Sequence, residues 1–256
     1  MHVALPVNRW PSSKCAKAFW SQQDVGPYQQ LLSDTIDWAN PEAGEHWLDL
    51  GCGGGPISRA LWERTNGTVG SVIGLDCAAV NDTAYERLRA ELQVNEPDRL
   101  HFVHHDFSSG LGIFPDARFD HVVSGLSISY AESYDEGTGR WTTAAYDRLP
   151  AEVRRVLRPG GRFVFSVNVP EPSWSRIAMR SMPGLLRSGR PLRSMKRALR
   201  MLRYGRWLKK EARIGRFHYL PAGEVTQRLV SAGFTNVSHR LSYCEQAYIF
   251  RAVNPA

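Results

Sequence analysis

The stretch WLDLGCGGGPIS, Trp47 to Ser58, places four glycines within five positions directly after a short apolar run. Glycine loses more conformational freedom on folding than any other residue, so this density indicates a backbone that turns tightly or lets a ligand approach closely. The run before the glycines is typical of a buried strand, and Pro56 suits the first turn of a helix. The stretch therefore predicts a strand, a ligand-binding loop and a helix.

Two nucleotide-binding patterns fail to match this loop. A dinucleotide site requires G-x-G-x-x-G, but Gly51 and Gly53 are followed by Pro56 at the third position. A P-loop requires G-K-[ST], which is absent. Asp49 precedes the glycines, and its negative charge would repel a diphosphate but attract a ligand that carries a cationic amino group.

Short apolar runs alternate with helical patterns between residues 45 and 169. We expect strands in HWLDLG (46–51), GSVIGLDC (70–77), RLHFVHHDF (99–107), FDHVVSGLSI (119–128) and RFVFSVNV (162–169), and helices in PISRALWERT (56–65), AYERLRAELQV (84–94) and AEVRRVL (151–157), which ends at the helix stop RPGG. Such alternation predicts a parallel sheet with helices on both faces.

The flanking segments complete the expected organisation. A helical pattern in 21–41 ends at Asn40-Pro41, and PAGEVTQRLVSAGF (221–234) predicts a last helix. Two strand-like runs, 235–243 and 245–253, then follow without an intervening helix, which predicts an antiparallel pair at the sheet end. We expect a single domain over 1–256, with an N-terminal helical segment (1–44), a core (45–170), a basic helical insertion (171–219), and the last helix and hairpin (220–256).

Composition narrows the class of protein. The 256 residues are 43% hydrophobic, which suffices for one sizeable α/β domain. The start has no secretory pattern, and no apolar run approaches the ~20 residues of a membrane span. Four scattered cysteines without a C-x-x-C spacing indicate reduced thiols and no metal site. We expect a cytoplasmic protein, with peripheral attachment to a membrane as an alternative.

Charge is concentrated in one segment. The net charge is +7, and residues 175–216 hold fourteen Lys or Arg and one acid, Glu211, so the segment carries +13 and the remainder −6. Leu192, Met195, Leu199 and Leu202 form one helical stripe within it. Three interpretations remain open: a lid over the site, a helix on an anionic membrane surface, and a contact with nucleic-acid phosphates, which we favour least.

LDLGCGGG resembles the first motif of class I S-adenosylmethionine-dependent methyltransferases, an acid-x-Gly-x-Gly-x-Gly pattern formed here by Asp49, Gly51, Gly53 and Gly55. VIGLDCA, VHHDF, FDHVVSGLSISY and VLRPGGRFVFS resemble the family's later landmarks, in order. The resemblance covers Trp20 to Val169 and the last helix and hairpin. It implies a doubly wound, Rossmann-like, mostly parallel seven-stranded sheet with a C-terminal antiparallel hairpin, and S-adenosylmethionine as methyl donor with S-adenosylhomocysteine as product.

The resemblance also implies roles for individual residues. Asp76 would hold the ribose hydroxyls, Asp106 the adenine amino group, Phe107 the adenine ring, and Ser124 to Leu126 the methionine part of the ligand. The implied cofactor set is Asp49, Gly51, Cys52, Gly53, Gly55, Asp76, Cys77, Asp106, Phe107 and Ser124. Each acid has a structural alternative as a cap or turn residue, and Cys52 has one as a small space-filling side chain.

The methyl acceptor is less constrained. A sulfonium activates its own methyl group, so a general base is required only when the nucleophile is protonated. Tyr130 and His218 are the candidate catalytic residues, with a packing aromatic and a capping or surface histidine as alternatives. The Asn/Asp-Pro-Pro-aromatic motif of nucleic-acid amino methylation is absent, since SGLSIS stands there. We expect a small-molecule acceptor, lipid-like or anionic, with an RNA methyltransferase and a non-catalytic S-adenosylmethionine-binding module as alternatives.

Overall fold

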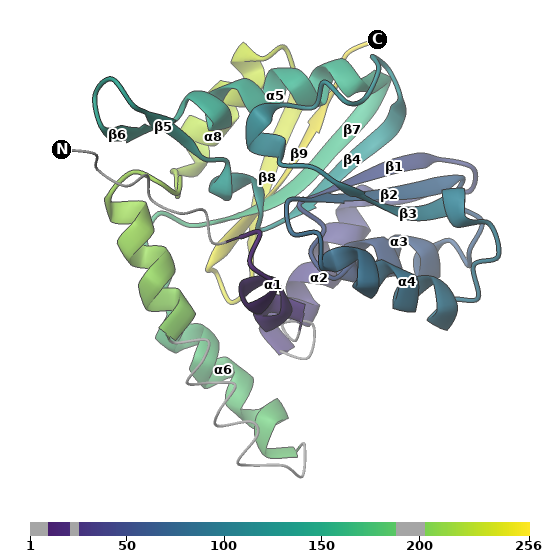
Figure 1. Ribbon diagram of the computed structural model, residues 1–256, viewed down its shortest axis with the longest axis horizontal. Coiled ribbons are helices and arrows are strands. Elements are labelled where there is room, and N and C mark those ends of the chain that lie inside the picture. The colour runs from purple at the N-terminus through teal and green to yellow at the C-terminus, as the bar shows by residue number, and fades with distance from the viewer. Residues whose placement is uncertain (1–9, 21–25, 188–202) are drawn as a thin grey trace.

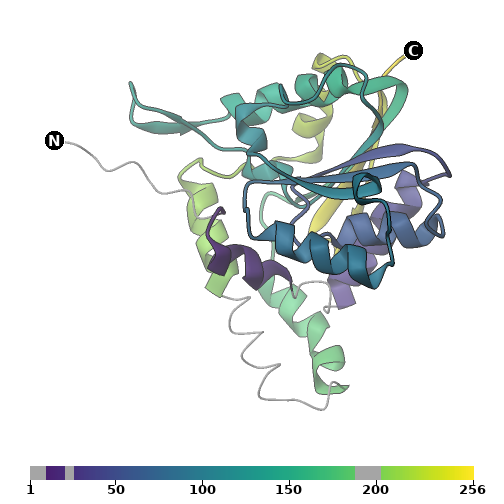
Figure 2. The same ribbon diagram turned by 45° about the vertical axis from the view of Figure 1, so that its right-hand side comes forward.

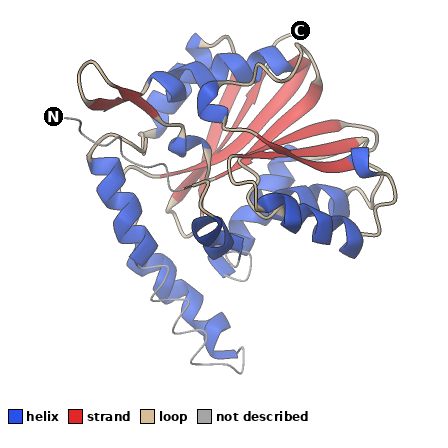
Figure 3. Ribbon diagram, in the orientation of Figure 1, coloured by secondary structure: helices blue, strands red, loops and turns tan. Residues whose placement is uncertain are grey.

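A computed structural model describes residues 10–20, 26–187 and 203–256 of the chain. Seven strands form one sheet in the order β3-β2-β1-β4-β7-β9-β8 (Figures 1 and 3). The strands are β1 (His46–Leu50), β2 (Ser71–Asp76), β3 (Leu100–His104), β4 (Phe119–Gly125), β7 (Leu157–Asn168), β8 (Thr235–Ser242) and β9 (Ala247–Val253). The first five are mutually parallel, and β9 runs antiparallel to both β7 and β8. The predicted doubly wound sheet with its C-terminal antiparallel hairpin is confirmed.

Helices cover both faces of this sheet (Figure 3). They are α1 (Ser13–Phe19), α2 (Gly26–Ala39), α3 (Pro56–Arg64), α4 (Asn81–Glu91), α5 (Ala144–Val156), α6 (Trp174–Arg187) and α8 (Ala222–Ser231), together with helical residues 203–213. Side chains of α2, α3 and α4 share one buried apolar cluster with the sheet, and those of α5 and α8 share the other. Three short 3-10 turns are η2 (Pro97–Arg99), η3 (Phe107–Ser109) and η4 (Ile128–Tyr130).

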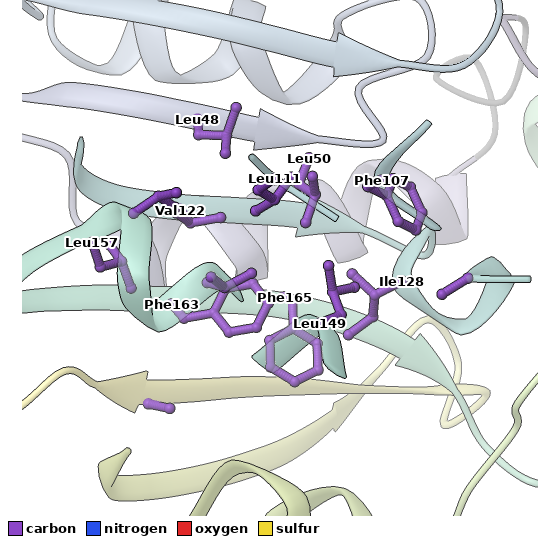
Figure 4. Packing of buried hydrophobic residues seen from close by; sticks show 14 of the residues in the cluster. Leu48, Leu50, Phe107, Leu111, Val122, Ile128, Leu149, Leu157, Phe163 and Phe165 are labelled. Atoms are coloured by element: carbon purple, nitrogen blue, oxygen red, sulfur yellow. The ribbon is translucent and has the colours of Figure 1, made fainter. Parts of the chain in front are cut away.

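The central strands are buried on both faces, which explains why their sequences are almost continuously apolar. Leu48 and Leu50 of β1 pack with Phe163 and Phe165 of β7 in the cluster of Figure 4. Trp47, which directly precedes Leu48, belongs to the cluster on the opposite face. This packing fixes the strand register, so the carboxyl ends of β1 to β4 and β7 meet along one edge of the sheet.

A two-stranded antiparallel hairpin, β5 (Ser133–Asp135) and β6 (Arg140–Thr142), was not predicted. Its turn is held by Asp135, whose Oδ1 accepts a hydrogen bond from the Gly137 amide at 2.9 Å and whose Oδ2 accepts one from Thr138 Oγ1 at 2.7 Å. Figure 1 shows the hairpin projecting from the body. The hairpin is a separate sheet, so the fifth strand that we expected from RFVFSVNV (162–169) corresponds to β7.

The helix stop predicted at RPGG is confirmed, because α5 ends at Val156. The same four residues already belong to β7, which begins at Leu157. The helix itself begins at Ala144 and accommodates Pro150 in its interior, so it is longer than the AEVRRVL pattern indicated.

Helix α6 and residues 203–213 form an arm that extends from one side of the body (Figures 1 and 2). At the base of the arm, Gly205 lies so close to Trp174 that a Cβ there would meet the indole Cγ at 2.6 Å. The predicted stripe of Leu192, Met195, Leu199 and Leu202 lies outside the described residues. None of the described helices has the length and apolar character that crossing a membrane requires.

Candidate functional site

A cavity of about 290 Å³ lies over the carboxyl edge of the sheet. Its walls include the glycine loop after β1, Asp76 at the end of β2, Asp106 after β3, residues 125–127 at and after the end of β4, and Asn168 at the end of β7. Strand order reverses between β1 and β4, and open α/β sheets bind ligands at such a switch point. The topology therefore brings most of the predicted cofactor residues into one space.

The glycine loop is shaped by contacts that exclude a side chain. Gly51 has φ +71°, and a Cβ there would lie 2.3 Å from Ser127 Oγ. Gly55 has φ +81° at the N-cap of α3, where a Cβ would lie 2.9 Å from Leu88 Cδ2. Because both positions require left-handed backbone and close approach, glycine is the residue that fits. Gly51, Gly53 and Gly54 present bare backbone to the cavity, whereas Gly55 is not one of its lining residues.

Asp49 is 1% exposed and lines the cavity. Its Oδ2 accepts hydrogen bonds from the Ser58 amide at 3.1 Å and from Ser58 Oγ at 2.7 Å, which is the capping role given as its structural alternative. Its Oδ1 has no hydrogen-bond partner among the described residues. Burial raises the pKa of Asp49 to about 7. A buried, unmatched carboxylate oxygen fits a cationic amino group, which would supply both the missing donor and the missing charge.

Asp76 holds the glycine loop against β2. Its Oδ2 accepts a hydrogen bond from the Gly53 amide at 3.0 Å, and its Oδ1 accepts one from the Ala78 amide at 2.9 Å. Burial raises the pKa of Asp76, and these amide contacts oppose the increase. Each carboxylate oxygen can accept a second hydrogen bond, so the residue retains capacity for two hydroxyl groups. Cys77 lines the cavity beside it.

Asp106 and Phe107 lie beyond Asp76 along the same wall. Asp106 caps η3 by accepting a hydrogen bond from the Ser108 amide at 2.9 Å, so its structural alternative also holds. Phe107 is 9% exposed, and its Cε1 would lie 3.3 Å from a Cβ on Gly51. This places an acceptor oxygen and an aromatic face side by side, as a purine with an exocyclic amine would require.

Ser124 lies behind the cavity wall and is not one of its lining residues. Its Oγ donates a hydrogen bond to the Leu50 carbonyl at 2.7 Å and lies 2.6 Å from Ser127 Oγ. Ser127 lines the cavity instead. Cys52 does line it, but burial raises the pKa of its thiol well above the usual value. The thiol therefore stays protonated and acts as a small apolar side chain.

Tyr130, in η4, lines the far part of the cavity. Its Oη accepts a hydrogen bond from Asn168 Nδ2 at 3.3 Å and lies 3.2 Å from Tyr219 Oη. Burial raises the pKa of Tyr130 to about 12. The phenol is consequently protonated at neutral pH and can orient a ligand, but it is poorly suited to act as a base there.

His218 is not brought to the cavity. It is 4% exposed and is absent from the lining residues. Its Nε2 lies 3.2 Å from the Ala131 carbonyl, so that nitrogen carries the proton, and its ring packs 5.2 Å from that of Tyr146. Burial lowers the pKa of His218. This environment matches a neutral histidine that ties residue 218 to the segment after η4.

Several lining residues were not predicted. Trp10, Phe19 and Trp20 come from the N-terminal segment, and Trp174 and Leu208 come from the base of the arm. The sequence around these residues has neither a strand pattern nor a glycine loop, so it does not indicate that they lie beside the cavity. Asn168 could have been found, because it is a polar residue at the carboxyl end of the apolar run FVFSVNV, where parallel sheets place ligand contacts. Within the described ranges, no group of His, Cys, Asp or Glu side chains could hold a metal ion.

The family model described as "Methyltransferase domain" matches residues 48–165. The chain is 28% identical over 138 residues to demethylmenaquinone methyltransferase from Oceanobacillus iheyensis, which covers 54% of this chain and 50% of the relative. It is also 28% identical over 99 residues to ribosomal RNA small subunit methyltransferase H from Rickettsia rickettsii, which covers 39% of this chain and 30% of the relative. The chain thus spans half of the first relative and less than a third of the second.

Among solved structures, the fold is similar to phosphoethanolamine N-methyltransferase 2 from Haemonchus contortus, determined with phosphomonomethylethanolamine and S-adenosylhomocysteine. The TM-score is 0.59, the sequences are 14% identical, and the match covers 96% of this chain and 58% of that chain. At this identity the likeness concerns the fold.

Proposed function

This chain belongs to the class I S-adenosylmethionine-dependent methyltransferases, and from that premise we propose that it transfers the methyl group of S-adenosylmethionine to a small-molecule acceptor. The observation that carries the proposal is the unmatched Oδ1 of buried Asp49 in the cavity beside the glycine loop. An anion at this position favours a ligand that ends in an ammonium group. Asp76, Asp106 and Phe107 supply the remaining contacts that an adenosine requires.

The proposed arrangement assigns one part of the donor to each wall. The adenine would lie against Phe107 with its amino group at Asp106, the ribose hydroxyls would bind Asp76, and the amino group would bind Asp49 Oδ1. Asp106 and Phe107 follow β3, Asp76 is the last residue of β2, and Asp49 lies near the end of β1. The sulfonium would then lie beyond the glycine loop and face Tyr130.

The donor supplies an electrophilic methyl group when it is bound. The acceptor's lone pair forms a bond to the methyl carbon as the carbon–sulfur bond breaks, the electron pair remains on sulfur, and any proton displaced from the nucleophile passes to water. The protein's part is to hold the two partners in line and to exclude bulk solvent, because positioning supplies much of the rate in such a reaction. Tyr130 would orient the acceptor through its protonated phenol.

Calorimetric titration with S-adenosylmethionine and S-adenosylhomocysteine tests the donor site. We expect both to bind the wild type, and Asp76→Asn to weaken binding at least ~10-fold, because an amide oxygen replaces only one of two acceptor oxygens. Asp98→Asn is the matched control, since Asp98 is exposed in η2, at the amino end of β3, whereas the cavity lies at the carboxyl ends of the strands. Absence of binding by the wild type would refute the proposed function.

The acceptor class is the finer part of the proposal. The ribosomal RNA relative keeps an RNA acceptor as the alternative. Trp10, Trp174 and Leu208, from segments remote in sequence, enclose the cavity. This enclosure of the cavity favours a small-molecule acceptor. A module that binds the donor without catalysis would retain the titration result but show no labelled methyl group on any acceptor in a cell extract.

We further propose that the arm binds an anionic membrane surface and presents a hydrophobic acceptor to the cavity at its base. Exposed cations of the described residues gather on the arm, namely Arg176, Arg180, Arg203, Arg206, Lys209, Lys210 and Arg213. Met179 in α6 and Ile214, directly after residues 203–213, are exposed apolar side chains, with 65% and 52% exposure. Cations together with exposed apolar groups are typical of surfaces that bind anionic headgroups.

Co-sedimentation with vesicles tests the arm. We expect binding to phosphatidylserine-containing vesicles but not to neutral ones, and a loss of at least ~10-fold in Arg206→Glu/Lys209→Glu/Lys210→Glu, since each cation contributes about 1 kcal/mol near such a surface. Lys14→Glu/Arg140→Glu/Arg251→Glu is the matched control, because these three exposed cations lie outside the arm. Binding to RNA at moderate salt without binding to vesicles would overturn the membrane proposal.

A further inference from the structure

The cavity has two halves of different chemistry. The donor half, at the ends of β1, β2 and β3, contains every charged lining residue that the structure describes: Asp49, Arg59, Asp76, Arg87, Glu91 and Asp106. The acceptor half begins at Ser127 and lies over the ends of β4 and β7. Its walls carry aromatic side chains from six segments: Trp10, Phe19, Tyr28, Tyr130, Trp174 and Tyr243.

The aromatic walls of the acceptor half are packed against one another. The ring of Trp10 lies 4.7 Å from that of Tyr130 and 5.4 Å from that of Phe19, measured between centroids. Tyr130 in turn contacts Phe217 at 4.9 Å. Rings fixed in this way present flat apolar faces at a low cost in side-chain entropy, and they favour a ligand that is itself flat.

The tyrosines of the acceptor half are neutral. Burial raises the pKa of Tyr28, Tyr130 and Tyr243 above the usual value for a phenol. The described walls of this half therefore offer no cation to an anionic ligand and no carboxylate to a cationic one. Moving an unpaired ion into such surroundings costs far more than moving a neutral molecule of the same shape.

Asn168 is the exception to the apolar character of these walls. It is 1% exposed, and its Nδ2 donates to Tyr130 Oη at 3.3 Å. Its Oδ1 has no hydrogen-bond partner among the described residues. A buried amide oxygen without a donor is costly, so this atom favours a ligand that brings an O–H or N–H group.

From these observations, and resting on the proposed function, we infer that the methyl acceptor is a neutral, flat, hydrophobic molecule whose O–H or N–H group is donated to Asn168 Oδ1. The inference narrows the acceptor expected from the sequence, because it retains the lipid-like alternative and removes the anionic one. It also means that the cations of the arm, which lie outside the acceptor half, would not touch the acceptor.

Three probes of one shape test this inference. 2-Naphthol is neutral and has a donor, 2-methoxynaphthalene is neutral and has none, and 2-naphthoate is an anion. Each is titrated calorimetrically into the protein saturated with S-adenosylhomocysteine. We expect 2-naphthol to bind at least ~10-fold more tightly than either of the others, because it alone satisfies Asn168 without burying a charge.

A variant then assigns the preference to Asn168. In Asn168→Leu the affinity for 2-naphthol should fall ~10-fold, to that of 2-methoxynaphthalene, whose own affinity should change by less than ~2-fold. A purely structural role for Asn168 would weaken both probes equally. Asn95→Leu is the control, because Asn95 is exposed in the segment between α4 and η2, which precedes the amino end of β3 and is not part of the cavity walls. The comparison of the three probes in the wild type tests the inference even if Asn168→Leu does not fold.

The outcomes distinguish this inference from the proposed function. If S-adenosylhomocysteine binds and 2-naphthoate equals or exceeds 2-naphthol, the inference is wrong and the donor site stands. The same holds if S-adenosylhomocysteine binds and none of the three probes does. If S-adenosylhomocysteine itself does not bind, the proposed function fails.

Discussion

Asp49 combines two roles in one buried side chain. Oδ2 caps α3 through Ser58, and Oδ1, which has no hydrogen-bond partner in the part of the chain that the structure describes, belongs to a residue that lines the cavity. The sequence predicted the acid and its preference for a cationic ligand. It could not reveal that the two oxygens have different partners, because that depends on how α3 packs against β1.

The raised pKa of Asp49 predicts a pH-dependent affinity for the donor. The ionised form binds an ammonium group, and with a pKa of about 7 in the free protein, that form increases about five-fold between pH 6 and pH 7. We expect the affinity for S-adenosylmethionine to rise by a similar factor over this interval, below the range in which an α-amino group itself titrates. Calorimetric titration at a series of pH values measures it.

Asp49→Asn provides the control for this dependence, since the amide keeps the shape and removes the titration. Its affinity should be lower and independent of pH across the same interval. An unchanged pH profile in Asp49→Asn would show that another group is responsible.

Gly51 gives a second prediction at the residue scale. Gly51→Ala would force a left-handed backbone on a residue with a Cβ and drive that Cβ to 2.3 Å from Ser127 Oγ. We expect a loss of about 1–3 kcal/mol in the free energy of unfolding and a weaker affinity for S-adenosylhomocysteine. Gly112→Ala is the matched control, because a Cβ there meets nothing within 4 Å. Equal effects of the two substitutions in urea unfolding would contradict the packing argument.

At the scale of elements, buried Arg216 joins the arm to the body. Its guanidinium binds Glu132 at 2.9 Å and Glu211 at 3.2 Å, and it lies 4.6 Å from the centroid of the Trp141 ring in β6. The arginine is 3% exposed, so these charges are paired where water has little access. The contacts connect the unpredicted hairpin, the segment after η4 and the end of the arm.

Arg216→Met should destabilise the protein by about 3–5 kcal/mol, because it leaves two buried carboxylates without their cation. Urea unfolding measures the change. Arg158→Met is the comparison, since Arg158 pairs with Asp120 at the surface and its loss should cost less than about 1 kcal/mol. A small and similar cost for both would mean that the Arg216 cluster does not hold the arm in place.

The hairpin β5–β6 shows where the sequence was insufficient at this scale. Its strands are three residues each, which is too short to give a periodic pattern. By contrast, the strands of the main sheet were predictable because they are buried on both faces and are therefore apolar throughout.

At the scale of the whole molecule, the predictable part of the site is the part carried by the glycine loop and the strand ends. Asp49, Asp76, Asp106 and Phe107 lie at or just after the ends of strands that the alternation predicts, and all four line the cavity. Ser124 does not, since β4 continues to Gly125 and turns Ser127 toward the cavity. In the acceptor half, Tyr130 was predicted, whereas Trp10, Trp174 and Leu208 were not, because they reach it only through tertiary packing.

We propose that residues 1–256 fold as one cooperative unit, which is the single domain expected from the sequence. Asp34 of α2 accepts hydrogen bonds from Ser242 Oγ and, through its carbonyl, from Arg240, so α2 is tied to the C-terminal hairpin. We expect circular dichroism and tryptophan fluorescence to report the same urea midpoint. Two separated transitions would contradict a single unit.

We propose that S-adenosylmethionine occupies this cavity with its methyl group toward the aromatic half. A crystal structure with S-adenosylhomocysteine tests it most directly. We expect the adenine against Phe107, the ribose hydroxyls on Asp76, the amino group within hydrogen-bonding distance of Asp49 Oδ1, and the sulfur facing Tyr130. A product bound elsewhere, or with its adenine in the acceptor half, would contradict it.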